Sequence, residues 1–185
     1  MKDLNWKTRS SEYLFTENWL RIRKDICETK DGKIISPYFV YEFPDWVTAV
    51  ALTQDGKIIM ERQYRHALGI TDWEIPGGCV DKTDANLQDA IARELLEETG
   101  YQFTHFELLG KTSANPSTNN NLMHMYLATG GHLVREQELD HNEEIEVYLF
   151  TINELKQLLR ENKIVQSMHV TALFYALERL GELRY

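Results

Sequence analysis

Residues 93–101 read RELLEETGY, and this stretch decides both the fold and the chemistry expected of the chain. Glu94, Glu97 and Glu98 stand at positions i, i+3 and i+4, so a helix places their carboxylates on one face, about 5–6 Å apart. Like charges at this spacing destabilise an isolated helix by about 0.2–0.5 kcal/mol per pair. A hard divalent cation such as Mg²⁺ compensates the repulsion, because it takes carboxylate, water and phosphate oxygens as ligands. The alternative is a solvated face on which Arg93 pairs with the glutamates.

The helix that carries these glutamates is predicted over residues 85–99. Its apolar face is formed by residues at i, i+4 and i+8, namely Leu87, Ile91 and Leu95. Gly100 is expected to end it, since glycine readily adopts the left-handed conformation that follows many helices. Gly77 and Gly78 precede it, and the backbone there can approach a ligand closely because glycine has no Cβ. The carbonyl of Gly78 is therefore a candidate metal ligand.

Strand patterns flank this helix on both sides. Turn-forming residues at 30–32 and 54–56 join strand-type segments into two predicted hairpins, 19–28 with 33–43 and 46–52 with 57–62. After the central helix come three expected strands, 103–112, 122–129 and 144–151, and two expected helices, 152–161 and 166–180. This order of elements predicts an α/β sandwich.

Length and charge restrict the classes of protein that the chain can represent. Its 185 residues fit one domain, 1–185, in which residues 1–45 form an N-terminal antiparallel β lobe able to serve in dimer formation. The net charge of −9 disfavours a nucleic acid partner. No apolar run approaches the roughly 20 residues of a membrane span, and the N-terminal residues lack the apolar core of a signal peptide. We therefore expect a cytoplasmic protein without a membrane partner.

The segment around the acidic helix resembles the signature of the Nudix hydrolase family, G-x5-E-x7-R-E-U-x-E-E-x-G-U, where U is a bulky apolar residue. The second half of that signature is matched position for position, by Arg93, Glu94, Leu95, Glu97, Glu98, Gly100 and Tyr101. At average residue frequencies, its five charged and glycine identities arise by chance at roughly one start position per million. The resemblance implies a Nudix-type α/β/α sandwich with a mixed β-sheet.

The first half of the signature is matched less closely. Gly78 lies one residue farther from Arg93 than the pattern prescribes. Counting back from Arg93 puts Ala85 at the position of the first Glu, whereas counting forward from Gly78 puts Asp84 there. We interpret this as a one-residue insertion beside Asp84, whose carboxylate would then support the metal-binding glutamates.

The resemblance also implies roles for the residues of the site. Metal ligands would be the Gly78 carbonyl and the carboxylates of Glu94, Glu97 and Glu98, holding Mg²⁺, with Mn²⁺ as the other candidate. Hydrolysis needs a base that takes the proton of the attacking water. Glu94 and Glu143 compete for that role, because Glu143 lies in the acidic segment 140–147, which resembles one that supplies a carboxylate in many such enzymes.

Substrate contacts are expected from four further residues: Arg65, Glu74, Asn115 and Asn121. Arg65 ends the segment 63–65, similar to one in ADP-ribose pyrophosphatases, and its guanidinium matches phosphate geometry bidentately. A surface ion pair is the equal alternative. The two asparagines belong to a pattern found in some Nudix sequences and would read a base or sugar hydroxyls. Turn formation is their alternative role.

Together these residues predict metal-dependent hydrolysis of a diphosphate linkage in a nucleoside diphosphate derivative. The resemblance favours ADP-ribose as substrate, giving AMP and ribose 5-phosphate, and a homodimer as the assembly. Alternatives are hydrolysis of another nucleotide sugar or of an oxidised nucleoside triphosphate, and an isomerase on the same scaffold. A catalytically weak nucleotide-binding regulatory module is the alternative from another class.

Overall fold

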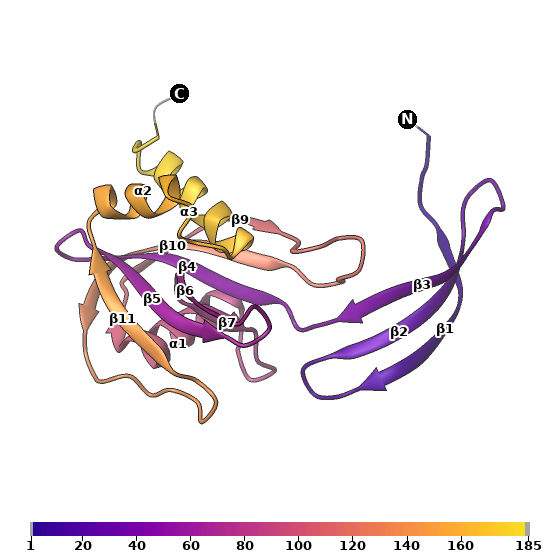
Figure 1. The fold of residues 1–185 in the computed structure, drawn as a ribbon, viewed down its shortest axis with the longest axis horizontal. Helices are drawn as coiled ribbons and strands as arrows, with labels where there is room; N and C mark the ends of the chain where they lie inside the picture. The colour runs from indigo at the N-terminus through magenta and orange to yellow at the C-terminus, as the bar shows by residue number, and fades with distance from the viewer. Residues whose placement is uncertain (1, 184–185) are drawn as a thin grey trace. The chain divides into compact units, whose positions relative to one another are not determined.

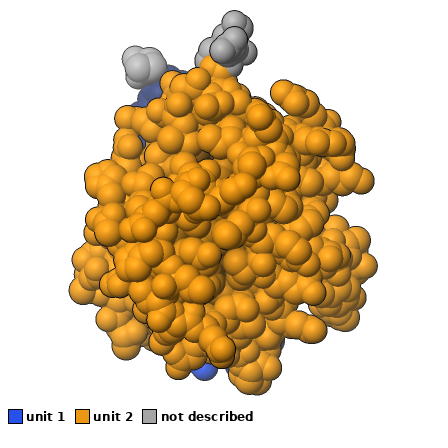
Figure 2. Space-filling model, turned by 90° about the vertical axis from the view of Figure 1, so that its left-hand side faces the viewer, with its two compact units in different colours: residues 1–44, 113–122 blue, residues 45–112, 123–185 orange. Residues whose placement is uncertain are grey.

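The computed structural model describes residues 2–183, which form two compact units. Unit 1 comprises the chain up to Pro44 together with the segment Ser113–Leu122. Unit 2 comprises Asp45–Thr112 and the chain from Met123 onward, and Figure 2 shows one face of it in orange. The predicted acidic helix and the glycine pair both belong to unit 2.

Unit 1 is built on an antiparallel three-stranded sheet in the order β1-β2-β3. Strand β2 (Arg21–Glu28) pairs with β3 (Ile34–Glu42), which confirms the first predicted hairpin. Strand β1 (Lys7–Thr16) was not expected, because all ten of its residues are exposed and no burial pattern marks it. The segment Ser113–Leu122 joins the unit through backbone hydrogen bonds, among them Tyr41 N–H to the Thr118 carbonyl at 2.8 Å.

Unit 2 contains a mixed β-sheet. Its described strands are β4 (Trp46–Thr53), β5 (Ile58–Arg65), β6 (Ile70–Glu74), β7 (Gly77–Cys79), β8 (Tyr101–Gln102), β9 (His105–Thr112), β10 (Met123–Leu133) and β11 (Ile145–Phe150). The main order is β11-β5-β4-β10-β8, and β6, β7 and β9 pair with β5, β4 and β10 respectively. Strands β4 and β10 are parallel, whereas the other pairs are antiparallel.

Strands β4 and β5 exchange partners along their length. They pair at Leu52 and Ile58, beside the predicted Asp-Gly turn, which confirms the second hairpin. Farther along, β4 pairs with β7 and β5 pairs with β6, so that Glu61 lies opposite Glu74. The short connection from β6 to β7 therefore carries the chain from β5 to β4, beside the glycine pair.

Helices cover both faces of this sheet (Figure 1). Helix α1 (Leu87–Thr99) lies on one face, and α2 (Ile152–Arg160) and α3 (Ser167–Arg179) lie on the other. Two buried apolar clusters fill the two interfaces, one joining α1 to strands β4, β5 and β10, the other joining the same strands to α2 and α3. The α/β prediction with a mixed sheet between helices is confirmed.

The ends of the helices follow from capping groups. Helix α1 begins two residues later than predicted because Asn86 is its N-cap, with a side chain that accepts the Asp89 N–H at 3.0 Å. Helix α2 begins after Thr151, which forms a capping box with Glu154.

No helix in residues 2–183 is long and apolar enough to cross a membrane.

Candidate active site

Helix α1 is held in place by its apolar face and by Gly100. The side chains of Ala90, Ile91 and Leu95 are fully buried against the sheet. Gly100 has φ +74° and its N–H donates to the Leu96 carbonyl at 3.1 Å, as predicted for the helix end. A Cβ at this position would lie 2.1 Å from the Arg135 carbonyl oxygen, so glycine is required there. This anchoring fixes the direction in which the three glutamates point.

The three glutamates of α1 differ in their surroundings. Glu94 and Glu98 are buried, at 9% and 5% exposure, whereas the Glu97 side chain is 36% exposed. An Oε2 atom of Glu98 accepts the backbone N–H of Gly77 at 2.8 Å. Buried carboxylates are rare unless they are paired or bind metal. Two of the three positions therefore disagree with a merely solvated face.

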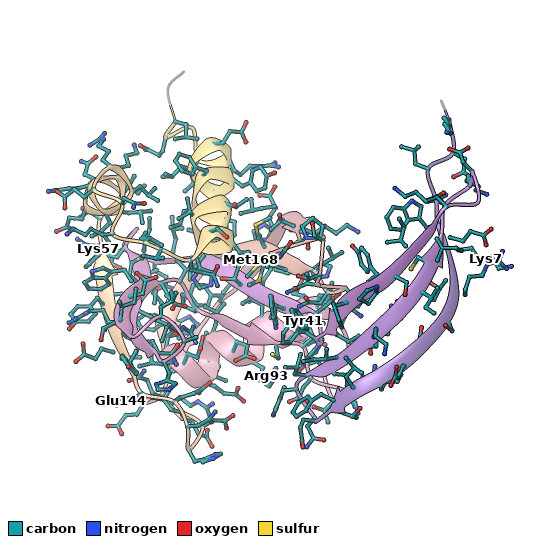
Figure 3. The ribbon with its side chains drawn as sticks, turned by 45° about the vertical axis from the view of Figure 1, so that its right-hand side comes forward. Lys7, Tyr41, Lys57, Arg93, Glu144 and Met168 are labelled. Atoms are coloured by element: carbon teal, nitrogen blue, oxygen red, sulfur yellow. The ribbon has the colours of Figure 1, made fainter. Side chains whose placement is uncertain are left out.

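Arg93 lies among these carboxylates and is labelled on α1 in Figure 3. Its guanidinium lies 3.1 Å from Glu94 Oε1 and donates to Glu97 Oε2 at 2.9 Å. It also makes a bidentate contact with Asp84, with both N–O distances at 3.0 Å, and donates to the Cys79 carbonyl at 3.1 Å. Asp84 thus holds the arginine that in turn holds two glutamates, which is the supporting arrangement expected if the insertion lies beside it.

We expect Asp84→Ala to lower the free energy of unfolding by about 1–2 kcal/mol, because it leaves two donors of a half-buried guanidinium without acceptors. Chemical denaturation checks this. Asp81→Asn is the matched control, since Asp81 lies in the same loop with an exposed side chain and contributes its backbone rather than its carboxylate to the turn. Equal stability of the two variants would contradict the supporting role of Asp84.

The glycine pair fits between strand and helix with no space for side chains. A Cβ on Gly77 would lie 2.2 Å from the Val47 carbonyl oxygen, and the residue has φ +155°. A Cβ on Gly78 would lie 2.5 Å from Glu94 Oε1. The backbone of Gly78 in β7 is therefore packed directly against the carboxylate of Glu94.

Arg65 and Glu74 form a second charged pair in unit 2. Arg65 donates to both carboxylate oxygens of Glu74 at 2.6 Å, and this contact raises the pKa of Arg65 further above its usual value. Glu74 is buried, while the Arg65 side chain remains 45% exposed. The ion pair named as the alternative for Arg65 is present. Because Glu74 fixes the guanidinium from one side, the pair also supplies a preoriented cation.

Comparison with known proteins adds to this geometry. The family model described as the NUDIX domain matches residues 43–170. The chain belongs to the Nudix family. A second family model, the nucleoside diphosphate sugar hydrolase N-terminal domain, matches residues 6–41. The predicted family is therefore confirmed, and with it the prediction of a Nudix pyrophosphohydrolase.

Several relatives of this Nudix chain align over most of their length. The "methanol dehydrogenase activator" of Bacillus methanolicus is 31% identical, covering 91% of each chain. The "ADP-ribose pyrophosphatase" of Bacillus subtilis is 30% identical over 95% of this chain and 94% of its own, and that of Mycobacterium tuberculosis is 30% identical over 94% and 84%. A crystal structure of an "ADP compounds hydrolase" has the same fold, with a TM-score of 0.83 and 20% identity, over 99% of this chain and 100% of that one.

Nudix hydrolases generally need a divalent metal ion, and the side chains of this Nudix chain fit one chemically. Burial, together with the charges of neighbouring carboxylates, raises the pKa of Glu94 to about 7 and that of Glu98 well above its usual value. A bound divalent cation offsets both causes of the raised pKa values. It takes the place of the water that burial removed, and it neutralises the repulsion between the carboxylates. Within residues 2–183, no three acidic, His or Cys side chains are already gathered as a closed ligand set. These residues therefore fit a divalent cation through the kind of ligand atom that they offer, which is carboxylate oxygen.

The remaining predicted residues fall into two groups. Glu143 precedes β11 in unit 2, in the same loop as Glu144 of Figure 3, and its charge raises the pKa values of Glu94 and Glu98. Asn115 and Asn121 belong to unit 1. The Asn115 side chain accepts the Ser117 N–H at 3.2 Å, as in a local turn, and Asn121 donates to the Pro44 carbonyl at 2.8 Å. Substrate contact by these two asparagines remains a prediction.

Two buried residues of this site were not predicted from the sequence. Glu61 lies in β5 at 3% exposure, and burial, followed by the charge of Glu74, raises its pKa to about 8. His169 of α3 lies with its Nδ1 atom 3.5 Å from Glu74 Oε2, and burial lowers its pKa to about 4, so it is neutral near pH 7. The sequence offered one signal that could have pointed to Glu61, namely a charged residue directly after the apolar run 58–60.

Proposed function

We propose that this Nudix chain hydrolyses the diphosphate linkage of ADP-ribose, with Mg²⁺ as the preferred metal, to give AMP and ribose 5-phosphate. The observation that carries the proposal is the buried acidic face of α1 packed against the Gly77–Cys79 strand. The substrate is supported by two relatives named as ADP-ribose pyrophosphatases that align over nearly the whole chain.

In this proposal, the Gly78 carbonyl and the carboxylates of Glu94, Glu97 and Glu98 hold the cation. When bound, the cation neutralises phosphate oxygens and makes water a stronger nucleophile. Arg93 keeps Glu94 and Glu97 side by side through contacts of 3.1 and 2.9 Å. This preorientation places the negative charges before the substrate arrives, so that little reorganisation is needed.

The protein groups that handle the substrate are a base and a cation. The carboxylate of Glu94 or of Glu143 takes the proton of the attacking water. Arg65 contacts a phosphate with the part of its guanidinium that remains exposed beside Glu74. Water attacks one phosphorus of the P–O–P linkage, the bond from that phosphorus to the bridging oxygen breaks, and the proton taken by the base finally resides on the departing phosphate.

A substrate panel tests the proposal. ADP-ribose, another nucleotide sugar and an oxidised nucleoside triphosphate are incubated with the chain in Mg²⁺, in Mn²⁺ and with a chelator, and the products are separated by chromatography. We expect AMP from ADP-ribose with either metal and no product with the chelator. Cleavage of another member of the panel, with ADP-ribose left intact, would replace the substrate but keep the enzyme class.

A second candidate function is regulation through nucleotide binding. It is favoured by the 31% identity to a protein named as a methanol dehydrogenase activator, which aligns over 172 residues, close to the 176 and 174 of the pyrophosphatases. Calorimetry separates the two functions. A nucleotide that binds in Mg²⁺ and stays uncleaved for hours supports the regulatory module, whereas steady release of AMP supports the hydrolase.

A homodimer is part of the same proposal. Unit 1 exposes many large apolar side chains on its three-stranded sheet and adjoining segments, including Tyr13, Leu14, Phe15, Trp19 and Phe39, each at 45% exposure or more. Exposed apolar patches of this kind mark protein interfaces, and a second copy of the sheet offers the same surface. We expect light scattering during size-exclusion chromatography to give twice the chain mass of 21.7 kDa. A mass of one chain at micromolar concentration would overturn the dimer.

A further inference from the structure

Glu61 is a buried carboxylate that the proposed ligand set leaves unexplained. It follows Ile58, Ile59 and Met60 in β5, all of which are fully buried, and is itself only 3% exposed. Its Oε1 atom is buried and has no hydrogen-bond partner within residues 2–183. A buried carboxylate oxygen without a partner is strongly disfavoured, so a native structure that keeps one has a use for it.

The direction of the Glu61 side chain follows from the alternation of β5. Ile58 and Met60 pack in the apolar cluster between the sheet and α2 and α3, whereas Ile59 packs in the cluster between the sheet and α1. Residues two apart share a face of a strand, so Glu61 lies on the α1 side together with Ile59. The electrostatics agree, since Glu61 is the charge that raises the pKa of Glu98 most. Glu61 therefore adds a fourth carboxylate, from the sheet, to those of the helix.

The positive side chains near Glu61 are already engaged. Arg65 makes its two 2.6 Å contacts with Glu74, which lies opposite Glu61 in the β5–β6 ladder. Arg93 is held by Asp84 and Glu97. His169 is neutral near pH 7, because burial lowers its pKa to about 4. A proton or a cation from outside the chain is left to neutralise the Glu61 carboxylate.

We propose that Glu61 contributes its carboxylate to the divalent-cation site carried by Glu94 and Glu98. The inference rests on the proposed function, which places a cation at this helix face. It has two consequences of opposite sign. Without a cation, the burial of Glu61 and the charges of its neighbouring carboxylates destabilise the fold, so Glu61→Gln should raise Tm. With a cation, Glu61 is a binding group, so the same variant should gain less Tm from added metal.

The experiment compares wild type, Glu61→Gln and Glu161→Gln by calorimetric titration with Mn²⁺ and by thermal unfolding with and without it. Glu161 is the charge-matched control, because it is exposed at the end of α2 and its side chain only accepts a hydrogen bond from Gln157 Nε2 at 2.8 Å. We expect equal Mn²⁺ affinity for wild type and Glu161→Gln, and an affinity at least about tenfold weaker for Glu61→Gln. The cation-free Tm of Glu61→Gln should be higher than that of wild type.

The outcomes separate this inference from the proposed function. If wild type does not bind Mn²⁺, the cation site of the proposed function is overturned. If wild type binds and Glu61→Gln binds equally, only the role of Glu61 is overturned. If Glu61→Gln does not fold, the claim that Glu61 destabilises the cation-free protein is overturned. The claim that Glu61 binds the cation is then tested with Glu61→Asp. That variant keeps the charge on a shorter side chain, and an affinity equal to that of wild type would overturn the remaining claim.

Discussion

Glu97→Gln is expected to reduce kcat by about a thousandfold while leaving the fold intact. Removing one carboxylate from the cation site forfeits several kcal/mol of charge stabilisation, and about 4 kcal/mol corresponds to a factor of about a thousand in rate. The fold should persist because the Glu97 side chain is the most exposed of the three glutamates. A glutamine oxygen can still accept the 2.9 Å hydrogen bond from Arg93.

Steady-state kinetics with ADP-ribose and chemical denaturation measure the two halves of this prediction. Asp89→Asn is the control, since it removes one charge from the first turn of the same helix at an exposed position. That change weakens a favourable interaction with the helix dipole by about 0.3–1 kcal/mol and should leave kcat unchanged. A Glu97→Gln enzyme that keeps more than a tenth of wild-type kcat would remove this side chain from the mechanism.

Local patterns allowed much of unit 2 to be predicted from the sequence. The Gly100 cap of α1, the Asp-Gly turn before β5 and the i, i+3, i+4 spacing of the glutamates are each set by residues close together in the chain. The family resemblance rested on the same stretch. Strand β1 was missed because its ten exposed residues show no alternation of burial, and β2 pairs with it through the backbone.

Contacts between distant residues account for most of what the sequence did not reveal about the site. Glu61 faces Glu74 only because β5 pairs with β6 in one particular register. His169 approaches Glu74 only because α3 packs on the opposite face of the sheet from α1. The partner of Asp84 likewise depends on the loop before α1, where a turn from Asp81 brings the carboxylate to Arg93. A register or a packing angle leaves no trace in a single sequence.

Gly78→Ala should mainly lower activity, whereas Gly77→Ala should mainly lower stability, although the two residues are neighbours. At Gly78, the added Cβ meets the end of the Glu94 side chain, 2.5 Å from Oε1, which can move aside. We therefore expect a folded protein, destabilised by about 1–3 kcal/mol, in which the displaced carboxylate lowers kcat about a hundredfold.

At Gly77, the added Cβ meets backbone atoms, 2.2 Å from the Val47 carbonyl oxygen and 2.7 Å from the Cα of Thr48. These atoms belong to the β4–β7 ladder and cannot yield without breaking it, and φ +155° is strained for alanine. We expect a loss of more than about 3 kcal/mol in the free energy of unfolding. Gly110→Ala, with ordinary contacts from 3.6 Å, is the neutral control. Full stability of Gly77→Ala, or full activity of Gly78→Ala, would mean that the glycine pair does not set the distance between strand and helix.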